Sequence, residues 1–333
     1  MLSWKAMLKN KVSDHTSKQF VLSVLDGKGL NPASRKVLDS AEQNRVLFPW
    51  AVEYNLHSIE TEGEKWINKL TNTIKFINQV LDKKINYSIT RTYKYIDYVT
   101  FDVDLFVEDK NLKKTIELFK QSGCQVESHD ASFGGRISGS QVNVKKSELL
   151  TIDLHSDFTW QKRSFVDTSM ILKDGRKKEV GGINVDVPSA EVEFLLCMAD
   201  MGHERFNITL LDLIWLEGLS KEIKDWGLIF SQTKKNGWNR AFNEIGAIVN
   251  KLTLGIYNKK IIPGIKPKKV EYTLPVFIPI QICWLSYLEN ITHNKHFPLI
   301  SFAYMHYCKM RYYLSGKRKM PFYDSWYKEK EEE

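Results

Sequence analysis

Two aspartates separated by one residue, Asp102 and Asp104, stand within an apolar run that is typical of a β-strand. The segment Val99–Val107 reads Val-Thr-Phe-Asp-Val-Asp-Leu-Phe-Val and is rich in β-branched and aromatic residues. Residues i and i+2 of a strand point to the same side, so both carboxylates should project together. Neighbouring carboxylates repel each other unless a cation or a proton lies between them. Hard oxygen donors of this kind favour Mg²⁺ or Mn²⁺, and one of these ions is the expected cofactor.

A third aspartate, Asp153, lies in a second apolar segment, Leu149–His155. This segment also has the pattern of a strand, and the hairpin-rich chain between the two could return it beside the first. Three carboxylates on neighbouring strands suit two-metal phosphoryl transfer, in which ions roughly 3.5–4 Å apart bridge the attacking and leaving oxygens. The alternative is that an Asp-x-Asp pair at the end of a strand simply faces solvent.

The elements that must position these acids change in character along the chain. Apolar residues three and four apart predict a helix over 66–81, and a second helix is expected over 44–56. Asp109 is a candidate N-cap for a helix that runs to Ser122, with Gly123 as its stop. From Ser189, another candidate N-cap, the chain has helical periodicity again. Further extended segments are predicted over residues 124–128, 134–146, 149–154 and 179–187.

This order of elements predicts an α+β fold, with a small mixed β-sheet core flanked by N-terminal helices and a C-terminal helical domain. The expected divisions are an N-terminal helical segment over 1–85, an α/β core over 86–188 and a helical domain over 189–333. The last part ends in a basic, aromatic tail, in which Thr292–Lys330 interleaves Lys and Arg with Tyr and Trp. That composition suits either contacts with nucleic acid or a helical core with a basic edge.

The composition is that of a globular protein with a basic balance. The chain has 333 residues, a formal net charge of +8 and a pI near 9.0, which favours polyanionic partners such as nucleotides. Its four cysteines form no Cys-x-x-Cys pair, which indicates reduced thiols in a cytoplasmic protein. The longest uncharged run, Tyr272–Leu288, contains two prolines and is too short to span a bilayer, so we expect a buried helical segment there and no membrane span.

Several motifs occur together in a characteristic order. The aspartate-pair strand is followed by the strand that contains Asp153–His155, then by a helix start at Pro188–Glu191. Farther on, Gly202–Arg205 leads into Leu210–Leu213. Over about residues 45–245 the chain thereby resembles the polymerase-β-like nucleotidyltransferase superfamily, and within it the poorly characterised bacterial and archaeal branch.

The resemblance implies roles for the acidic residues. Asp102 and Asp104 would bind the metal ions that hold a nucleoside triphosphate. Asp153 would complete one metal site and help to deprotonate the acceptor hydroxyl. His155 has a weaker claim, as an accessory group near the metal or on the acceptor side.

The phosphate-binding turn of the superfamily has a counterpart here with a different composition. Members usually carry a Gly-Ser or Gly-Gly turn before the first strand, where backbone amides cradle phosphate. The corresponding stretch, Asn86–Thr92, contains no glycine. Hydroxyl and guanidinium groups could substitute for the missing amides. The expected nucleotide-binding residues are therefore Ser88, Thr90, Arg91 and Lys94, with Arg136 and Lys162 as possible accessory cations.

The function that follows is metal-dependent transfer of a nucleoside monophosphate from a triphosphate to an unidentified acceptor hydroxyl, with release of pyrophosphate. A catalytically degenerate member that binds nucleic acid or regulates a partner is the main alternative, because the turn lacks glycine. An Asp-x-Asp glycosyltransferase fits less well. It would give Asp153 no natural role, and no larger nucleotide-binding half precedes the pair.

Overall fold

The computed structural model describes residues 44–270 apart from 83, 97, 129–140, 161–162 and 206, together with isolated positions on either side (38, 41, 42, 274, 276–278, 282, 285 and 289). Arg136 and Lys162 lie outside the described residues, as does the basic, aromatic tail. Within the described part, no helix combines the length and the apolar character that crossing a bilayer requires.

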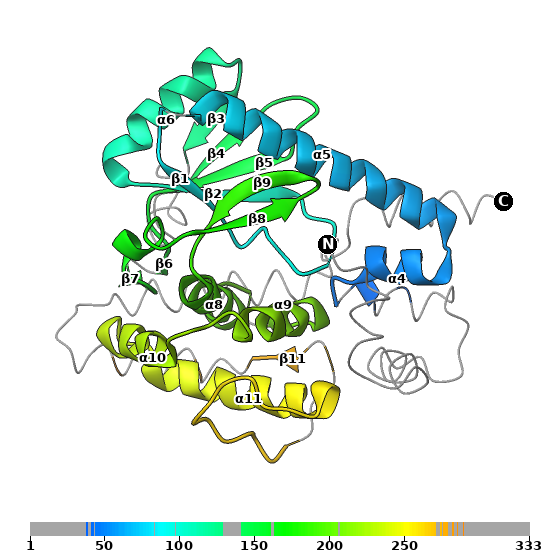
Figure 1. Cartoon of the computed structure of the whole chain (residues 1–333), viewed down its shortest axis with the longest axis vertical. Coiled ribbons are helices and arrows are strands. Elements are labelled where there is room, and N and C mark those ends of the chain that lie inside the picture. Colours follow the sequence, from blue (N-terminus) through cyan, green and yellow to red (C-terminus); the bar gives the residue numbers. More distant parts are fainter. Residues whose placement is uncertain are drawn as a thin grey trace.

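A five-stranded mixed sheet forms the centre of the upper half of the molecule (Figure 1). Its strand order is β1-β2-β5-β4-β3, and β2 and β5 are parallel whereas the other neighbours are antiparallel. The expected α+β fold is confirmed. The strands are β1 (Tyr87–Thr90), β2 (Asp102–Val107), β3 (Gln125–Ser128), β4 (Gln141–Lys145) and β5 (Thr151–His155).

Two helices cover one face of this sheet, α5 (His57–Leu81) and α6 (Asp109–Gln121). Apolar side chains of both helices share one hydrophobic cluster with alternate residues of β2, such as Val103 and Leu105. Gly123 ends α6 with φ at 81°, the left-handed conformation that glycine adopts at little cost. The predicted N-cap was wrong by one residue, because Glu108 occupies that position and Asp109 lies in the first turn. Asp109 instead places a negative charge near the positive end of the helix dipole.

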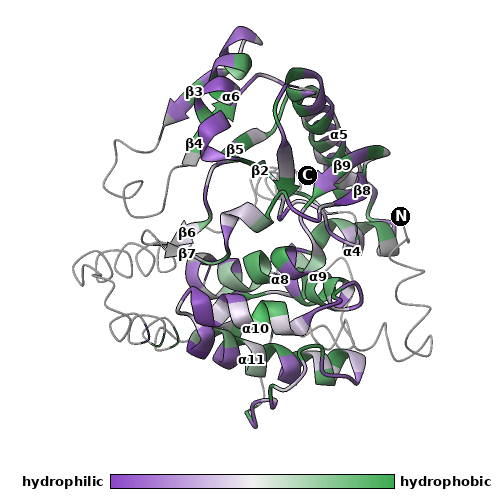
Figure 2. Ribbon diagram, turned by 60° about the vertical axis from the view of Figure 1, so that its left-hand side comes forward, coloured by the Kyte–Doolittle hydropathy of each residue, from purple (hydrophilic) through white to green (hydrophobic). Residues whose placement is uncertain are grey.

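The other face of the sheet lies toward a helical half of the molecule (Figure 1). Two of its helices, Ala190–Ala199 and Leu210–Ser220, are buried nearly all round. Their residues are mostly apolar, and Figure 2 therefore shows these helices largely green. The Ser189 hydroxyl caps the first helix by accepting a hydrogen bond from the Val192 amide, as predicted. The helices of this half are α8 (Ala190–Ala199), the π-helical turn η3 (Asp200–Arg205), α9 (Leu210–Ser220), α10 (Trp226–Lys235) and α11 (Asn239–Tyr257); α4 (Leu47–Tyr54) shares their hydrophobic cluster.

Short hairpins complete the described chain. Residues predicted as one extended piece over 179–187 form parts of two strands, because Gly181 and Gly182 both have positive φ and turn the chain back. Val276 and Phe277, predicted within a helical segment, form a strand instead. The hairpins and the 3-10 turn are β6 (Thr159–Trp160) with β7 (Arg163–Ser164), η2 (Thr168–Met170), β8 (Arg176–Val180) with β9 (Ile183–Val187), and β10 (Asn207–Ile208) with β11 (Val276–Phe277).

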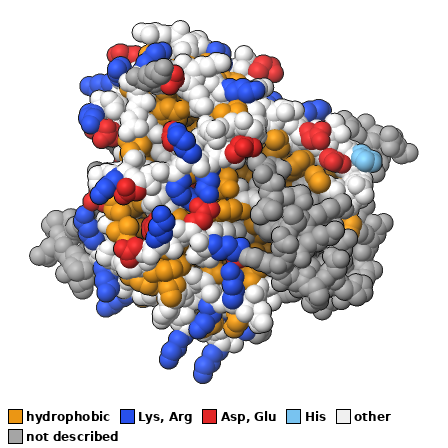
Figure 3. All heavy atoms as spheres, in the orientation of Figure 1, with side chains coloured by type: hydrophobic (Ala, Val, Ile, Leu, Met, Phe, Trp, Pro, Cys, Tyr) orange, Lys and Arg blue, Asp and Glu red, His pale blue; other side chains and the backbone are white. Residues whose placement is uncertain are grey.

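Charged side chains are mixed on the face shown in Figure 3. Over its described part, Lys and Arg are interspersed with Asp and Glu, and apolar side chains lie between them. The net charge of +8 is therefore not gathered into a single positive field on this side.

Candidate active site

The alternation of β2 separates its side chains between the two faces of the sheet. Val103 and Leu105 point into the cluster under α5 and α6, so Asp102 and Asp104 point to the opposite face. The parallel register places Asp104 directly opposite Asp153 on β5. The structure thus brings together the three aspartates that the sequence analysis selected, on the face that lies toward α8.

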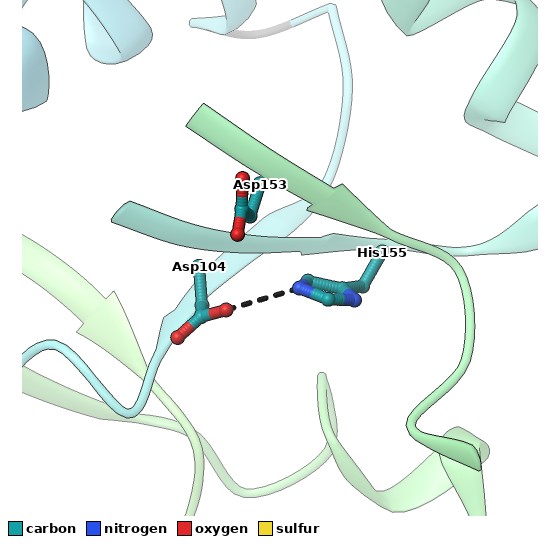
Figure 4. Close-up of side chains that lie close together, drawn as sticks. All are labelled: Asp104, Asp153 and His155. Atoms are coloured by element: carbon teal, nitrogen blue, oxygen red, sulfur yellow. Dashed lines mark hydrogen bonds and ion pairs between the residues drawn. The ribbon is translucent and has the colours of Figure 1, made fainter. Parts of the chain in front are cut away.

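His155 joins this group because it lies two residues after Asp153 on the same strand. Its Nε2 atom is 3.0 Å from Asp104 Oδ1, and Figure 4 shows the ring turned toward that carboxylate with Asp153 alongside. Ligand atoms of Asp104, Asp153 and His155 all lie within 4.8 Å of one another. Asp102, at the start of β2, is outside this tight set, and its Oδ1 accepts a hydrogen bond of 3.1 Å from the Thr100 hydroxyl.

The environment separates the pKa values of these acids. Burial, and after it the charges of Asp102 and Asp104, raise the pKa of Asp153 to about 7. Loss of solvent and then the charge of Asp104 also raise the pKa of Asp102. Burial opposes ionisation of Asp104 too, but the Arg91 charge and the His155 hydrogen bond outweigh it and hold the pKa of Asp104 below its usual value.

Arg91 lies at the end of β1 and contacts both halves of the molecule. Its Nη2 donates to Asp104 Oδ1 at 2.7 Å, and its backbone N–H donates to Glu193 Oε1 at 2.7 Å. The guanidinium carbon lies 5.1 Å from the centre of the Phe158 ring. Arg91 has φ at 54°, a conformation that glycine adopts readily and other residues adopt at a cost. Arg91 therefore adopts the left-handed conformation that glycine would favour at this turn, and its guanidinium is directed to Asp104.

The other residues of the predicted phosphate-binding turn are buried. Ser88 is 2% exposed and its hydroxyl is directed to the Asp186 carbonyl at 3.4 Å. Lys94 is 6% exposed, donates to the Arg91 carbonyl at 2.6 Å and lies over the Trp215 ring. Burial lowers the pKa of Lys94 to about 7. Both side chains are therefore engaged within the protein, and their direct contacts with a nucleotide stay a prediction.

Thr90 follows Ser88 by two residues on β1 and, like it, lies on the face of the aspartates. It lies directly opposite Asp104 in the antiparallel pairing of β1 with β2. Its side chain is fully buried, and its hydroxyl has no hydrogen-bond partner among the described residues. A buried hydroxyl is normally satisfied, so this one is available to a ligand or an ordered water at the site.

Sequence reasoning missed three polar residues around the aspartates. Glu193 on α8 holds the backbone of Arg91, and Asp200 lies with its Oδ1 4.0 Å from Arg91 Nη1. Asn143 on β4 lies directly opposite Asp153 and so shares its face. The alternation of Val142, Asn143 and Val144 could have indicated which way Asn143 points. No local pattern indicates the contacts of Glu193 or Asp200, because both depend on how the helices pack on the sheet.

The donor set fits a divalent metal ion. Asp104 and Asp153 supply carboxylate oxygens on adjacent strands, with Asp102 on the same face two residues earlier. The Thr90 hydroxyl, for which the described part of the chain offers no hydrogen-bond partner, lies on that face as well. Oxygen donors gathered on one face of a sheet in this way are what Mg²⁺ and Mn²⁺ bind in proteins.

Residues 100–253 match the model of a family described as an uncharacterised nucleotidyltransferase. The predicted resemblance to nucleotidyltransferases is confirmed over that segment. It begins just before β2 and ends within α11, so it contains the three aspartates and the helices that face them. Strand β1 and Arg91 precede the nucleotidyltransferase match. No curated protein and no solved structure is significantly similar to the chain.

Proposed function

We propose that this protein transfers a nucleoside monophosphate from a nucleoside triphosphate to an acceptor hydroxyl and releases pyrophosphate. The observation that carries the proposal is the register of β2 and β5, which sets Asp104 directly opposite Asp153 inside the segment that matches a nucleotidyltransferase family. Asp102 shares their face. A third acid opposite the pair has a role in this reaction and none in an Asp-x-Asp glycosyltransferase.

The two aspartates of β2 and Asp153 would hold the divalent ions, Mg²⁺ or Mn²⁺. Bound there, such ions neutralise the triphosphate and lower the pKa of the attacking hydroxyl. Asp153 is suited to accept the hydroxyl proton on a carboxylate oxygen, since burial and its acidic neighbours raise its pKa to about 7. The hydroxyl oxygen bonds to the α-phosphorus, the bond from that phosphorus to the bridging oxygen breaks, and pyrophosphate leaves.

Arg91 is suited to contact the phosphates. Its guanidinium lies against Asp104 and is 14% exposed, so it already stands at the place where a triphosphate would meet the aspartates. A guanidinium can donate two parallel hydrogen bonds to phosphate oxygens. The hydrogen bond from the Arg91 backbone N–H to the Glu193 carboxylate holds the backbone from which the Arg91 side chain extends. Arg91 would in this way do what backbone amides of a glycine turn do elsewhere in the superfamily.

The test is transfer of label from each α-labelled nucleoside triphosphate, with Mg²⁺ or Mn²⁺, to RNA, protein and small-molecule acceptors. We expect Asp104→Asn and Asp153→Asn to lower the rate by about a hundredfold or more, because each removes a charged group that acts in the transition state. A matched control is Asp186→Asn, because Asp186 is an exposed strand residue paired with Lys177. Binding of triphosphate without any transfer, together with salt-dependent binding of RNA or DNA, would identify the degenerate alternative instead.

A further inference from the structure

The imidazole of His155 stands in the position of a metal ligand. Because His155 and Asp153 are two residues apart on β5, their side chains leave the same face of the sheet. His155 Nε2 and Asp104 Oδ1 are 3.0 Å apart. Two neighbouring ligands of an octahedral ion, each about 2.1 Å from the metal, are separated by about 3.0 Å. The observed spacing thus suits a shared ion as well as a hydrogen bond.

We propose that His155 binds the metal ion directly, together with Asp104 and Asp153, and that the site thereby selects a divalent transition-metal ion over Mg²⁺. The ligand atoms of the three residues already lie within 4.8 Å of one another, so small side-chain movements close them on one ion (Figure 4). The inference rests on the proposed function in one respect, because Asp104 and Asp153 are metal ligands in both.

A second observation points to a ligand at this place. The Thr90 hydroxyl is fully buried, lies on the same face directly opposite Asp104, and has no hydrogen-bond partner among the described residues. A metal ion with three protein ligands keeps water molecules on its open positions. Such a water would donate to the Thr90 oxygen and satisfy it.

The chemistry of the donors decides which ion is preferred. Mg²⁺ takes oxygen ligands almost exclusively, whereas imidazole nitrogen suits transition metals. A set of two carboxylates and one imidazole therefore offers a divalent transition-metal ion a nitrogen donor that contributes little to Mg²⁺ binding, and Mn²⁺ is the paramagnetic ion used to detect it. Asp102 is outside this set, and its Oδ1 accepts a hydrogen bond from the Thr100 hydroxyl. Asp102 would bind the second ion, which holds the triphosphate.

The competing role for His155 is to position Asp104 by a hydrogen bond without touching the metal. A change in affinity cannot separate the two roles, because loss of an outer partner alone weakens metal binding about tenfold or more. A nitrogen nucleus bonded to Mn²⁺, however, couples magnetically to its unpaired electrons. Pulsed electron paramagnetic resonance detects that coupling directly and does not require the protein to be active.

The experiment uses the full chain, freed of metal and loaded with one equivalent of Mn²⁺ in the absence of nucleotide. We expect a ¹⁴N coupling that changes to the ¹⁵N pattern when the protein is grown with ¹⁵N-histidine and that disappears in His155→Gln. In Mn²⁺ titrations the same variant should bind about tenfold more weakly or worse, with Mg²⁺ affinity changed less than about threefold. His57→Gln is the matched control, because the His57 side chain is 86% exposed and His57 is the first residue of α5.

Absence of nitrogen coupling in the wild-type protein, or its persistence in His155→Gln, would overturn the proposal. Where the variant fails to fold, the isotope experiment on the wild-type chain still tests the proposal, because the lack of a histidine ¹⁵N signal there contradicts it. Failure of the proposed function is distinguishable: Mn²⁺ bound with nitrogen coupling in a protein that transfers no label would keep the metal site and refute the transferase.

Discussion

The guanidinium of Arg91 and the carboxylate of Asp104 form an ion pair at the candidate active site, with 2.7 Å between Arg91 Nη2 and Asp104 Oδ1. Both side chains are about one-seventh exposed, at 14% and 15%, so the pair is only partly screened by solvent. Asp104 therefore has a cationic partner that any metal ion must share or displace. This relationship makes Arg91 the residue whose substitution should affect metal and nucleotide in opposite directions.

Replacing Arg91 with Gln should strengthen metal binding and weaken triphosphate binding. Without the guanidinium, Asp104 loses a competitor for the metal, and we expect metal affinity to rise by roughly fivefold, about 1 kcal/mol. Triphosphate affinity should fall by about tenfold, since a charge-assisted contact is lost. Isothermal titration with Mn²⁺ alone, and then with triphosphate, measures both effects. If both affinities fell together, Arg91 would be a structural support for the aspartates and nothing more.

The left-handed backbone conformation of Arg91 leads to a separate prediction about stability. At φ of 54°, a side chain costs roughly 1–2 kcal/mol that glycine avoids. Arg91→Gly and Arg91→Ala both remove the ion pair with Asp104, so their difference reports the backbone alone. We expect Arg91→Gly to be more stable than Arg91→Ala by about 1 kcal/mol in urea unfolding. Equal stabilities would mean that the turn relaxes to another conformation.

Metal affinity should depend steeply on pH around neutrality because of Asp153. Burial, then the charges of Asp102 and Asp104, raise its pKa to about 7, well above the ordinary carboxyl value. A carboxyl ligand must be ionised to bind a metal, so the proton on Asp153 competes with the metal below that pKa and not above it. We expect Mn²⁺ affinity to fall by about tenfold for each pH unit below 7 and to level off above it.

Asp153→Asn is the control for that dependence. The amide does not titrate, so the variant should bind Mn²⁺ more weakly and with a shallower pH profile than the wild type between pH 6 and 8. The stability of the metal-free protein should change with pH in the opposite direction. A folded pKa above the unfolded one favours the protonated form, so this contribution is present below about pH 4 and lost as the pH rises through 7. A metal-free wild-type protein that gained stability over that range relative to Asp153→Asn would contradict the assignment.

Thr90→Val tests whether the buried hydroxyl serves a ligand. Valine keeps the shape of threonine and removes a polar group that has no partner among the described residues. The metal-free protein should therefore be unchanged or more stable by up to about 1 kcal/mol. Metal binding should weaken by several-fold if the hydroxyl accepts from a metal-bound water. Thr90→Ser is the comparison variant, because it retains the hydroxyl and should bind metal as the wild type does.

Local sequence pattern determined much of this structure. The alternation around Asp102 and Asp104 predicted β2 and the face that its acids share, since a strand has a strict two-residue period. The Ser189 cap and the end of α6 at Gly123 were likewise readable, because the groups that make them lie within a few residues. Where local signals competed, prediction failed: the two-glycine turn split one expected strand into a hairpin.

Only the tertiary structure decided how the site is completed. That Asp153 lies opposite Asp104 depends on the register of two parallel strands far apart in sequence. The contact of Glu193 with Arg91 depends on where α8 packs against the sheet. The burial of Lys94, whose ammonium lies over the Trp215 ring, likewise depends on where α9 packs. Periodicity specifies which side of an element a residue takes, whereas long-range packing specifies what it meets there.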